Sequence, residues 1–438
     1  MRASMLEIQQ YLDSHPVAKM NLQLKTKYIN LLKQLIAETG SQDLWVESMI
    51  RLYSLKLCDG SQEDKGFNFY ELFKNCFNYH YFRYFLLTDC LFITALNDRK
   101  KGDQVLKGVI QLYGEKYKNK LLSLFLAFYH TGNQTIIEKI PVLKPMYEVI
   151  WKNREFLGRT EKRIMVTANM SAGKSTLLNA LAGKKVNKMQ NTTCTAKIHY
   201  LHNKAGEDGL IYEWDHDLEL DATEEILMED NEANDSNEIH VGVRFRSLWD
   251  VDTRVCFIDT PGVNSSMESD HKEMSHETIK TTKCDLLLYL FNGENIGSDD
   301  DMRHLSFVKE NYNGNIIFLV NRMDRFKKGA DSVAETMKTV RKDLEKLGFS
   351  GPKIYPISAY AAYLAKMSIY GEKLNEDEQE ELEFLKRKLS REEFSYPSYY
   401  PNEVDLSDKK DNEFADVFVH SGISVSYTHL TLPTIYSV

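Results

Sequence analysis

A short loop between an apolar run and a helix-forming stretch is the feature that most restricts what this chain can fold into. The run Arg163–Thr167 is followed by Ala168-Asn-Met-Ser-Ala-Gly-Lys-Ser175, and a helical pattern begins at Lys174. A loop between a strand and a helix directs several backbone N–H groups at one point, where the helix dipole adds positive potential. The sequence therefore predicts a phosphate-binding loop.

Each residue of this loop has an expected role. Lys174 is expected to reach the β- and γ-phosphates of a nucleotide, and the Ser175 hydroxyl is expected to bind Mg²⁺. Ala168 stands where such loops carry their first glycine, and alanine tolerates fewer backbone angles than glycine. Further contacts to the nucleotide are expected from the neighbours of these residues, which are Asn169, Met170, Ala172, Gly173 and Thr176.

Short apolar runs alternate with helical stretches from residue 163 onward. Their near-continuous apolar character is typical of strands buried on both faces of a parallel sheet. Strands that alternate with helices predict right-handed βαβ units, and hence an α/β fold with a mainly parallel sheet flanked by helices. The predicted strands are 163–167, 254–258, 286–291, 315–320 and 353–357, with a further strand over 197–203.

Two of these strands lead into motifs that can recognise the phosphates and the base. Asp259-Thr-Pro-Gly262 follows strand 254–258, so Asp259 can hold the Mg²⁺ shell and the Gly262 N–H can sense the γ-phosphate. Asn321-Arg-Met-Asp324 follows strand 315–320. The Asp324 carboxylate can accept from N1–H and from the exocyclic amine of guanine, a donor pair that adenine lacks.

The base site has two further candidate contributors. Arg322 carries a flat guanidinium that can stack on the base. Ser358-Ala359 follows strand 353–357, where a backbone N–H can meet guanine O6. Each motif alone occurs by chance, but four in the required order, each at the C-terminal end of a predicted strand, predict a site for GTP/GDP and Mg²⁺.

The loop 191–196 is expected to close over the metal. Thr195 is the first candidate to bind Mg²⁺ and to position the attacking water, and Thr193 is the second. The alternative is that either threonine is an ordinary solvated loop residue. The predicted metal ligands are therefore Ser175, Thr195 and Asp259.

These motifs resemble those of the dynamin-like GTPase superfamily, especially its bacterial members. The resemblance rests on Met170–Leu181, Cys194–Ala196 and Asp259–Ser265. It implies a P-loop GTPase domain that hydrolyses GTP, with Ser171, Lys174 and Thr195 as the catalytic residues. The family has no glutamine directly after the glycine that corresponds to Gly262, and Val263 agrees with this. The resemblance implies that the protein forms a homodimer, or a larger assembly, across the nucleotide face. It also implies a helical stalk and a role in membrane remodelling.

The first 155 residues predict a domain made of helices. Leu24, Tyr28, Leu31, Leu32, Leu35 and Ile36 share one face at helical spacing, which marks an amphipathic helix. The predicted domains are thus 1–155, all helical, and 156–424, the GTPase domain. Residues 425–438 resemble the translated adapter of a sequencing library, so this tail is expected to be non-native and is kept out of the fold prediction.

Charge and cysteine usage restrict the partners. The net charge is −9, but residues 215–238 hold eleven acids and no Lys or Arg, so the remainder is nearly neutral. The sequence shows no basic footprint of the kind that binds nucleic acid, so no nucleic-acid partner is expected. The six cysteines form no CxxC pair, and no run reaches the ~18 apolar residues that a membrane-spanning helix requires. We therefore expect a cytoplasmic protein. The family resemblance adds the expectation of peripheral membrane attachment.

Two alternative functions share these motifs. One is a ribosome-associated GTPase, which usually carries a basic RNA-binding domain that this sequence lacks. The other is a nucleotide-dependent regulatory module with low intrinsic turnover, in which the N-terminal helices transmit the signal.

Overall fold

The computed structural model describes residues 5–39, 43–58, 82–132, 134–169, 171–186, 197–232, 236–246, 254–261, 269–329, 331–399 and 412–423. The chain forms two compact units. The first comprises Met1–Arg159 together with Lys204–Ala222, and the second comprises Thr160–Asn203 together with Thr223–Val438. The sequence placed 204–222 in the GTPase domain, whereas these residues pack with the helical unit. The predicted tail 425–438 lies outside the described residues.

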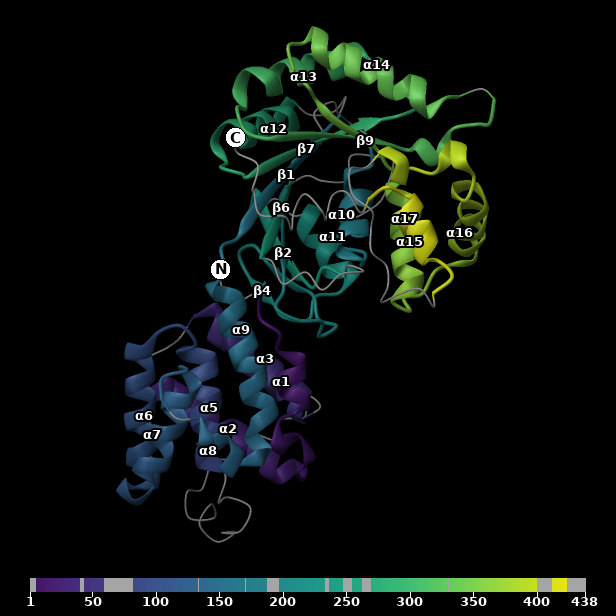
Figure 1. Ribbon diagram of the computed structural model, residues 1–438. Helices are drawn as coiled ribbons and strands as arrows, with labels where there is room; N and C mark the ends of the chain where they lie inside the picture. Colours follow the sequence, from purple (N-terminus) through teal and green to yellow (C-terminus); the bar gives the residue numbers. More distant parts are fainter. Residues whose placement is uncertain are drawn as a thin grey trace. The chain divides into compact units, whose positions relative to one another are not determined.

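The first unit is built almost entirely of helices, as the sequence predicts (Figure 1). Its core is lined by aliphatic and aromatic side chains from helices far apart in the sequence. Its elements are α1 (Gln9–Asp13), η2 (Pro16–Lys19), α2 (Leu22–Glu38), α3 (Leu44–Cys58), α5 (Phe82–Thr94), α6 (Arg99–Tyr113), η4 (Glu115–Tyr117), α7 (Lys118–Phe128), α8 (Thr135–Lys139), η5 (Pro141–Leu143) and α9 (Lys144–Gly158), with β3 (Tyr212–Trp214) paired antiparallel to β4 (Leu218–Glu219).

The segment 204–222 belongs to this unit because its apolar side chains complete the helical core. Leu210 and Tyr212 are buried there, and the Tyr212 hydroxyl donates to the Leu6 carbonyl at 3.0 Å. The Ser48 hydroxyl of α3 donates to the Leu218 carbonyl at 2.8 Å. Side-chain contacts at both ends of the segment therefore fix it to the helices.

A buried carboxylate lies at the centre of the helical unit. Asp89 of α5 is fully buried, and the hydroxyls of Tyr11, Tyr28 and Tyr53 all donate to it, the last at 3.3 Å. His15 Nε2 lies 2.9 Å from the same carboxylate. The Val17 N–H donates to His15 Nδ1, so the ring proton is on Nε2 and the histidine donates as well.

Donors from three parts of the chain therefore converge on one acceptor in α5. Burial, and then the charge of Asp89, raise the pKa of each of the three tyrosines well above its ordinary value, so their hydroxyls stay protonated donors. An ionised carboxylate in a protein interior is tolerated only when hydrogen bonds satisfy it. This cluster satisfies Asp89 with neutral donors and ties α1, α2, α3 and α5 together.

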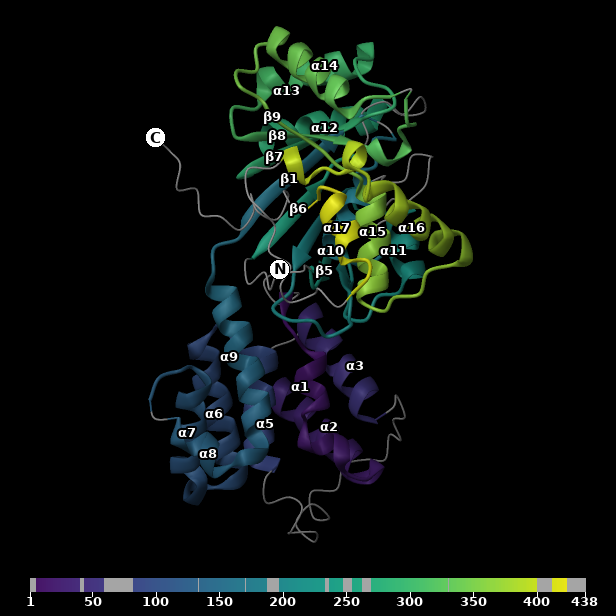
Figure 2. The ribbon, with the colours of Figure 1, turned by 45° about the vertical axis from the view of Figure 1, so that its right-hand side comes forward.

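The second unit is a sheet with helices on both faces (Figures 1 and 2). Its strands are β1 (Lys162–Ala168), β2 (Ile198–Asn203), β5 (Glu238–Val243), β6 (Val255–Asp259), β7 (Leu286–Asn292), β8 (Ile316–Asn321) and β9 (Lys353–Pro356). They lie in the order β5-β2-β6-β1-β7-β8-β9. All neighbours are parallel except β2 and β6, which are antiparallel. The α/β fold and each predicted strand are confirmed.

The helices of this unit form two layers. Figures 1 and 2 show α12, α13 and α14 over one face of the sheet, and α10, α15, α16 and α17 over the other. The bounds are α10 (Lys174–Ala182), α11 (Glu224–Glu232), α12 (Ser269–Thr281), α13 (Asp299–Asn311), η6 (Met323–Arg325), α14 (Val333–Lys346), α15 (Ala359–Ile369), α16 (Glu376–Leu389), η7 (Glu392–Phe394), η8 (Pro397–Tyr399) and α17 (Ala415–His420). In the described ranges, none of the helices has the length and apolar character of a transmembrane span.

Candidate nucleotide-binding site

The phosphate loop joins β1 to α10, as predicted. Gly173 precedes α10 with a φ of 93°, a conformation that side chains rarely adopt. A Cβ at this position would lie 2.4 Å from Asn321 Nδ2, so only glycine fits. Lys174 and Ser175 begin the helix and are partly exposed, and Ser171 has a positive φ of 57°. Met170 lies outside the described residues. The loop backbone is thus folded back on itself at the helix N-terminus.

Asn321 connects three of the four predicted motifs. It is the last residue of β8 and is buried. Its Nδ2 donates to the Ala172 carbonyl at 2.8 Å, and its Oδ1 accepts from the Ala359 N–H at 2.9 Å. The phosphate loop, the β8 motif and the start of α15 are therefore held together by one side chain.

These bonds affect the expected contact with guanine O6. The Ala359 N–H is already bonded to Asn321, and the Ser358 N–H donates to the Ser421 carbonyl at 2.8 Å. A contact from Ala359 to the base stays a prediction, and it requires Asn321 to share or release that N–H. The Ser358 hydroxyl caps α15 by accepting from the Ala361 N–H.

Asp324 lies in the short helix η6 directly after β8. It is 7% exposed, and burial raises the pKa of its carboxyl above the ordinary value, although a hydrogen bond with Ser358 opposes the shift. Guanine would supply the two donors that the ionised carboxylate needs. Arg322 adopts a positive φ of 64°, and its guanidinium pairs with Glu294 at 3.2 Å, so stacking on the base stays a prediction.

The residues expected to hold Mg²⁺ lie at neighbouring strand ends. Asp259 ends β6, is 1% exposed, and lies in register with Val166 of β1. Ser175 follows the loop after β1. A hydroxyl and a carboxylate are hard oxygen ligands that suit Mg²⁺, which also takes phosphate and water oxygens. Over the described ranges no three His, Cys, Asp or Glu side chains are grouped so that they could hold a metal ion by themselves. Gly262, Thr193 and Thr195 lie outside the described residues.

Two residues of α13 support the phosphate loop, and sequence reasoning missed both. Asp301 accepts a hydrogen bond from Asn169 Nδ2, and His304 Nε2 lies 2.9 Å from Thr167 Oγ1. Burial raises the pKa of Asp301. Asp301 and His304 are three residues apart and so share a helix face. That spacing was the only sequence signal, and it is common to most amphipathic helices.

His304 makes the stability of this unit sensitive to acid. Burial, and then the charges of His276 and Lys174, lower its pKa from 6.5 to about 3. Between these values the unfolded chain binds a proton that the folded chain does not, so stability falls as pH falls. The slope is about 1.4 kcal/mol per pH unit. Urea unfolding of the second unit across pH 4–6 should show a shallower pH dependence for His304→Gln than for wild type. Equal slopes would contradict this assignment.

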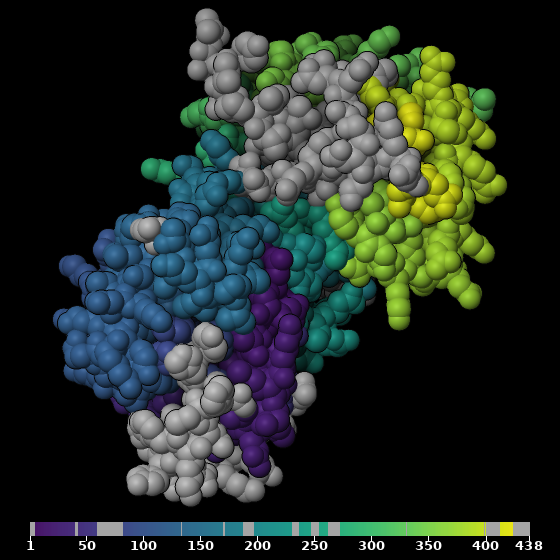
Figure 3. Space-filling view, turned by 60° about the horizontal axis from the view of Figure 1, so that its bottom comes forward, coloured from purple at the N-terminus to yellow at the C-terminus, as the bar shows by residue number. Residues whose placement is uncertain are grey.

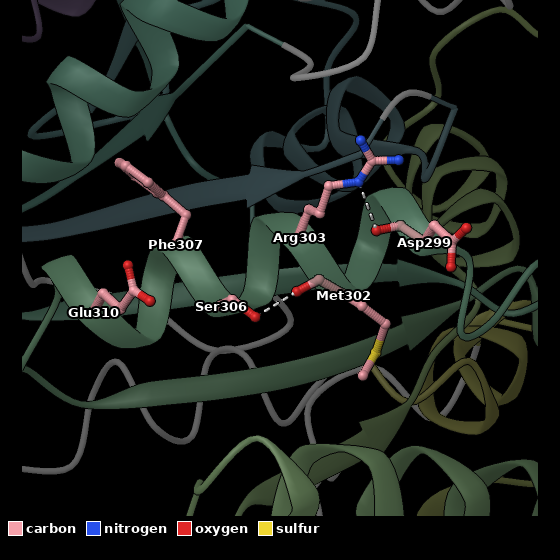
Figure 4. Close-up of a pocket in the computed structure, with 6 residues that line it drawn as sticks. All are labelled: Asp299, Met302, Arg303, Ser306, Phe307 and Glu310. Atoms are coloured by element: carbon pink, nitrogen blue, oxygen red, sulfur yellow. Dashed lines mark hydrogen bonds between the residues drawn. The ribbon is translucent and has the colours of Figure 1, made fainter.

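The outer surface of α13 is separate from these contacts. A hollow of about 560 Å³ lies along the helix and is lined by the six residues drawn in Figure 4. Two of its polar groups bond within the helix, because Arg303 Nε donates to the Asp299 carbonyl and the Ser306 hydroxyl to the Met302 carbonyl. None of the six is a predicted site residue, so the hollow is not the nucleotide site.

The strand order, the loop after β1 and the motifs after β6, β8 and β9 define a P-loop GTPase fold. Residues 164–323 match the profile of the dynamin family. This part of the chain is thus similar to the dynamin family, in agreement with the resemblance of its motifs. Dynamin-like protein A of Bacillus subtilis (strain 168) is 27% identical over 203 residues, which is 44% of this chain. The chain spans 16% of that relative's length.

Solved structures give more distant similarities. Aquifex aeolicus Era bound to GDP and AlF4⁻ is 18% identical, with a TM-score of 0.29, over 49% of this chain and 58% of its own. The G domain of the T. maritima FeoB iron transporter is 13% identical, with a TM-score of 0.26, over 46% of this chain and 89% of its own. These TM-scores are too low to support a fold assignment, so the assignment of a P-loop GTPase fold rests on the strand order and the motifs.

Proposed function

We propose that this chain binds GTP with Mg²⁺ and hydrolyses it to GDP. The observation that carries the proposal is the pair of hydrogen bonds made by Asn321, which joins the phosphate loop to the two base-recognition segments. A site that recognises both phosphate and guanine needs these segments at a fixed separation. Asp259, at the end of β6, supplies the carboxylate at the same edge of the sheet.

The chain's own groups suit phosphoryl transfer to water. In this reaction water attacks the γ-phosphorus in line with the leaving group, and the protein contributes positioning and charge stabilisation. Lys174 and the loop N–H groups would hold the charge that develops on the phosphate oxygens. Ser171 would orient the reacting groups, and Thr195 would position the water. Bound Mg²⁺ would neutralise phosphate charge, held by Ser175, Thr195 and Asp259.

Asp324→Asn is expected to shift the base preference of nucleotide binding from guanine toward xanthine. The amide cannot accept from both N1–H and the exocyclic amine, whereas xanthine offers an oxygen at the amine position. Losing a charge-assisted bidentate contact should weaken GTP binding by about 10- to 100-fold and raise relative affinity for xanthosine triphosphate. Competition binding with both nucleotides measures the ratio, and the exposed Asp300→Asn is the matched control. An unchanged ratio would remove the guanine assignment.

Thr195→Ala is expected to leave GDP binding intact and to stop turnover. The reason is that this threonine is assigned to the γ-phosphate side of the site and to the attacking water, neither of which GDP needs. Single-turnover hydrolysis and GDP titration of Thr195→Ala and Thr193→Ala together decide the assignment. Loss of turnover in Thr193→Ala alone would transfer the role to that residue.

The proposal extends to self-assembly and to membranes. We propose dimerisation across the nucleotide face, with faster turnover in the dimer, and a peripheral membrane role for a cytoplasmic protein. The similarity of residues 164–323 to the dynamin family supports self-assembly. Sedimentation velocity with GDP, and with GDP plus aluminium fluoride, tests the first part. A monomer in both states contradicts it. Co-sedimentation with phospholipid vesicles tests the second, and absence of binding with every nucleotide contradicts that.

A further inference from the structure

A positively charged groove lies beside the guanine-recognition turn of the second unit. Its volume is about 470 Å³, which is in the size range of small-molecule sites. It is formed where the turn after β8 meets the C-terminal end of α16. Figure 3 shows the yellow-green part of the chain, which includes α16, at the surface. Its lining consists of five cations and three phenylalanines and includes no acid: Phe326, Lys327, Lys328, Phe384, Arg387, Lys388, Arg391 and Phe394.

Most of the charge in this groove is not neutralised by the protein. Lys328 pairs with Glu393 at 3.5 Å. Within the described part of the chain, no carboxylate lies in ion-pair distance of Lys327, Arg387 or Arg391. Clustered cations of one sign repel one another, and an anion among them would relieve that repulsion.

The groove also offers apolar surface to a ligand. Phe384 is 47% exposed on α16, so its ring is open to a ligand. Phe326 and Phe394 are almost completely buried and form the apolar base. Lys388 Nζ lies 4.9 Å from the centre of the Phe394 ring and 5.6 Å from that of Phe384. A ligand with both an anionic and a flat or apolar part therefore fits this lining better than a bare ion does.

Lys388 connects the groove to the guanine turn. Its Nζ donates to the carbonyl of Asp324, which lies within η6, and, at 2.6 Å, to that of Phe326, which directly follows η6. An ammonium group has three donors, so one remains for a ligand in the groove. Burial lowers the pKa of Lys388, while Asp324, Glu381 and Asp331 oppose the shift and Arg391 adds to it. An anion in the groove would hold Lys388 charged and in place.

We propose that this groove binds a phosphate-bearing ligand with a flat or apolar part, and that Lys388 transmits this binding to the guanine turn. The phosphate would lie among Lys327, Arg387 and Arg391, and the apolar part would lie on Phe384. The second half of the proposal rests on the proposed guanine-nucleotide site, and the first half does not. Because coupling is reciprocal, the ligand and a guanine nucleotide would strengthen each other's binding by the same factor.

The test uses the full chain saturated with GDP and Mg²⁺. ADP is the probe for a free ligand, because it carries a diphosphate and a flat ring that Asp324 does not recognise. Vesicles of phosphatidylcholine with phosphatidic acid, compared with phosphatidylcholine alone, are the probe for a lipid headgroup. The test variant is Arg387→Gln/Arg391→Gln. Its control is Lys338→Gln/Lys342→Gln, which removes the same charge from the exposed face of α14.

The test variant should bind ADP or the acidic vesicles about tenfold or more weakly than wild type, while the control and the GDP affinity of both variants stay unchanged. The arm that responds identifies the source of the phosphate. Equal binding by wild type and test variant in both arms, or equal loss in the control, would overturn the groove assignment. If wild type binds ADP through the groove but Lys388→Gln leaves GDP affinity unchanged, the coupling is wrong and the groove stands. If wild type does not bind GDP, the proposed function fails. The difference in ADP or vesicle binding between wild type and Arg387→Gln/Arg391→Gln still decides whether the groove is a binding site.

Discussion

Replacing Lys174 with alanine is expected to abolish measurable GTP binding. Lys174 is the first residue of α10, directly after a glycine that no other residue can replace without meeting Asn321. Its ammonium is the side-chain cation of the loop that is expected to reach the phosphates. Removing one partner of a hydrogen-bonded charge pair costs roughly 3 kcal/mol or more, which corresponds to over ~100-fold in affinity.

Titration with a fluorescent GTP analogue measures this effect directly. Lys342→Ala is the matched control, because Lys342 is an exposed lysine of the same unit on α14. It should bind as wild type does. Circular dichroism separates loss of binding from loss of fold, since α10 retains its helix formers when Lys174 becomes alanine. Normal affinity in a folded Lys174→Ala variant would remove the phosphate-loop assignment.

Asp89→Ala is expected to have the largest effect on stability. The substitution leaves three tyrosine hydroxyls and the His15 N–H buried without their common acceptor. An unsatisfied buried donor costs about 1–3 kcal/mol, and four donors share one cavity, so the expected loss is about 4 kcal/mol or more. That amount is a large fraction of the stability of a typical domain. The helical unit should therefore unfold at a much lower urea concentration.

Tryptophan fluorescence reports mainly on this unit, because three of the four tryptophans, Trp45, Trp151 and Trp214, lie in it. The exposed Asp103→Ala, on α6, is the control and should change stability by less than about 0.5 kcal/mol. Asp89→Asn should fall between the two, since an amide keeps one acceptor but adds donors to a cluster of donors. If Asp89→Ala unfolds at the same urea concentration as Asp103→Ala, the cluster does not stabilise the unit.

The strands and loops that carry the candidate nucleotide site could be predicted from the sequence because their signals are local. A buried strand, a loop and a helix start follow one another within a few residues at 163–175, and Asp259 and Asn321 each end a strand. The run of apolar residues that forms each strand predicts its place in a parallel sheet. These expectations concern neighbours in the chain, and the structure confirms the strands that carry them.

The rest could not be predicted because it depends on partners distant in sequence. Lys388 bonds to a carbonyl 64 residues away, and Asn169 bonds to Asp301, 132 residues away. Neither pair has a pattern that distinguishes it from an ordinary surface charge. The segment 204–222 follows β2 in the chain, so the sequence predicts that it belongs to the GTPase domain. Its buried side chains instead fill a core made by helices that precede β1.

Asp89 illustrates the same limit in the helical unit. It stands within an apolar helix whose residues 84–93 are otherwise almost all core formers. Its four donors come from three other parts of the chain, and only their three-dimensional arrangement shows why a carboxylate is stable there. A charged residue in an apolar helix indicates a partner, but the sequence does not identify it.

Phosphate release by the purified chain tests the central claim most directly. The rate should be measured with Mg²⁺ and either GTP or ATP, over a range of protein concentrations, for wild type and Lys174→Ala. We expect release from GTP, little release from ATP, and none from the variant, with a specific rate that rises with protein concentration if dimers are the active form. Equal release from GTP and ATP, or no release from GTP at any concentration, would contradict the assignment of this chain as a GTPase.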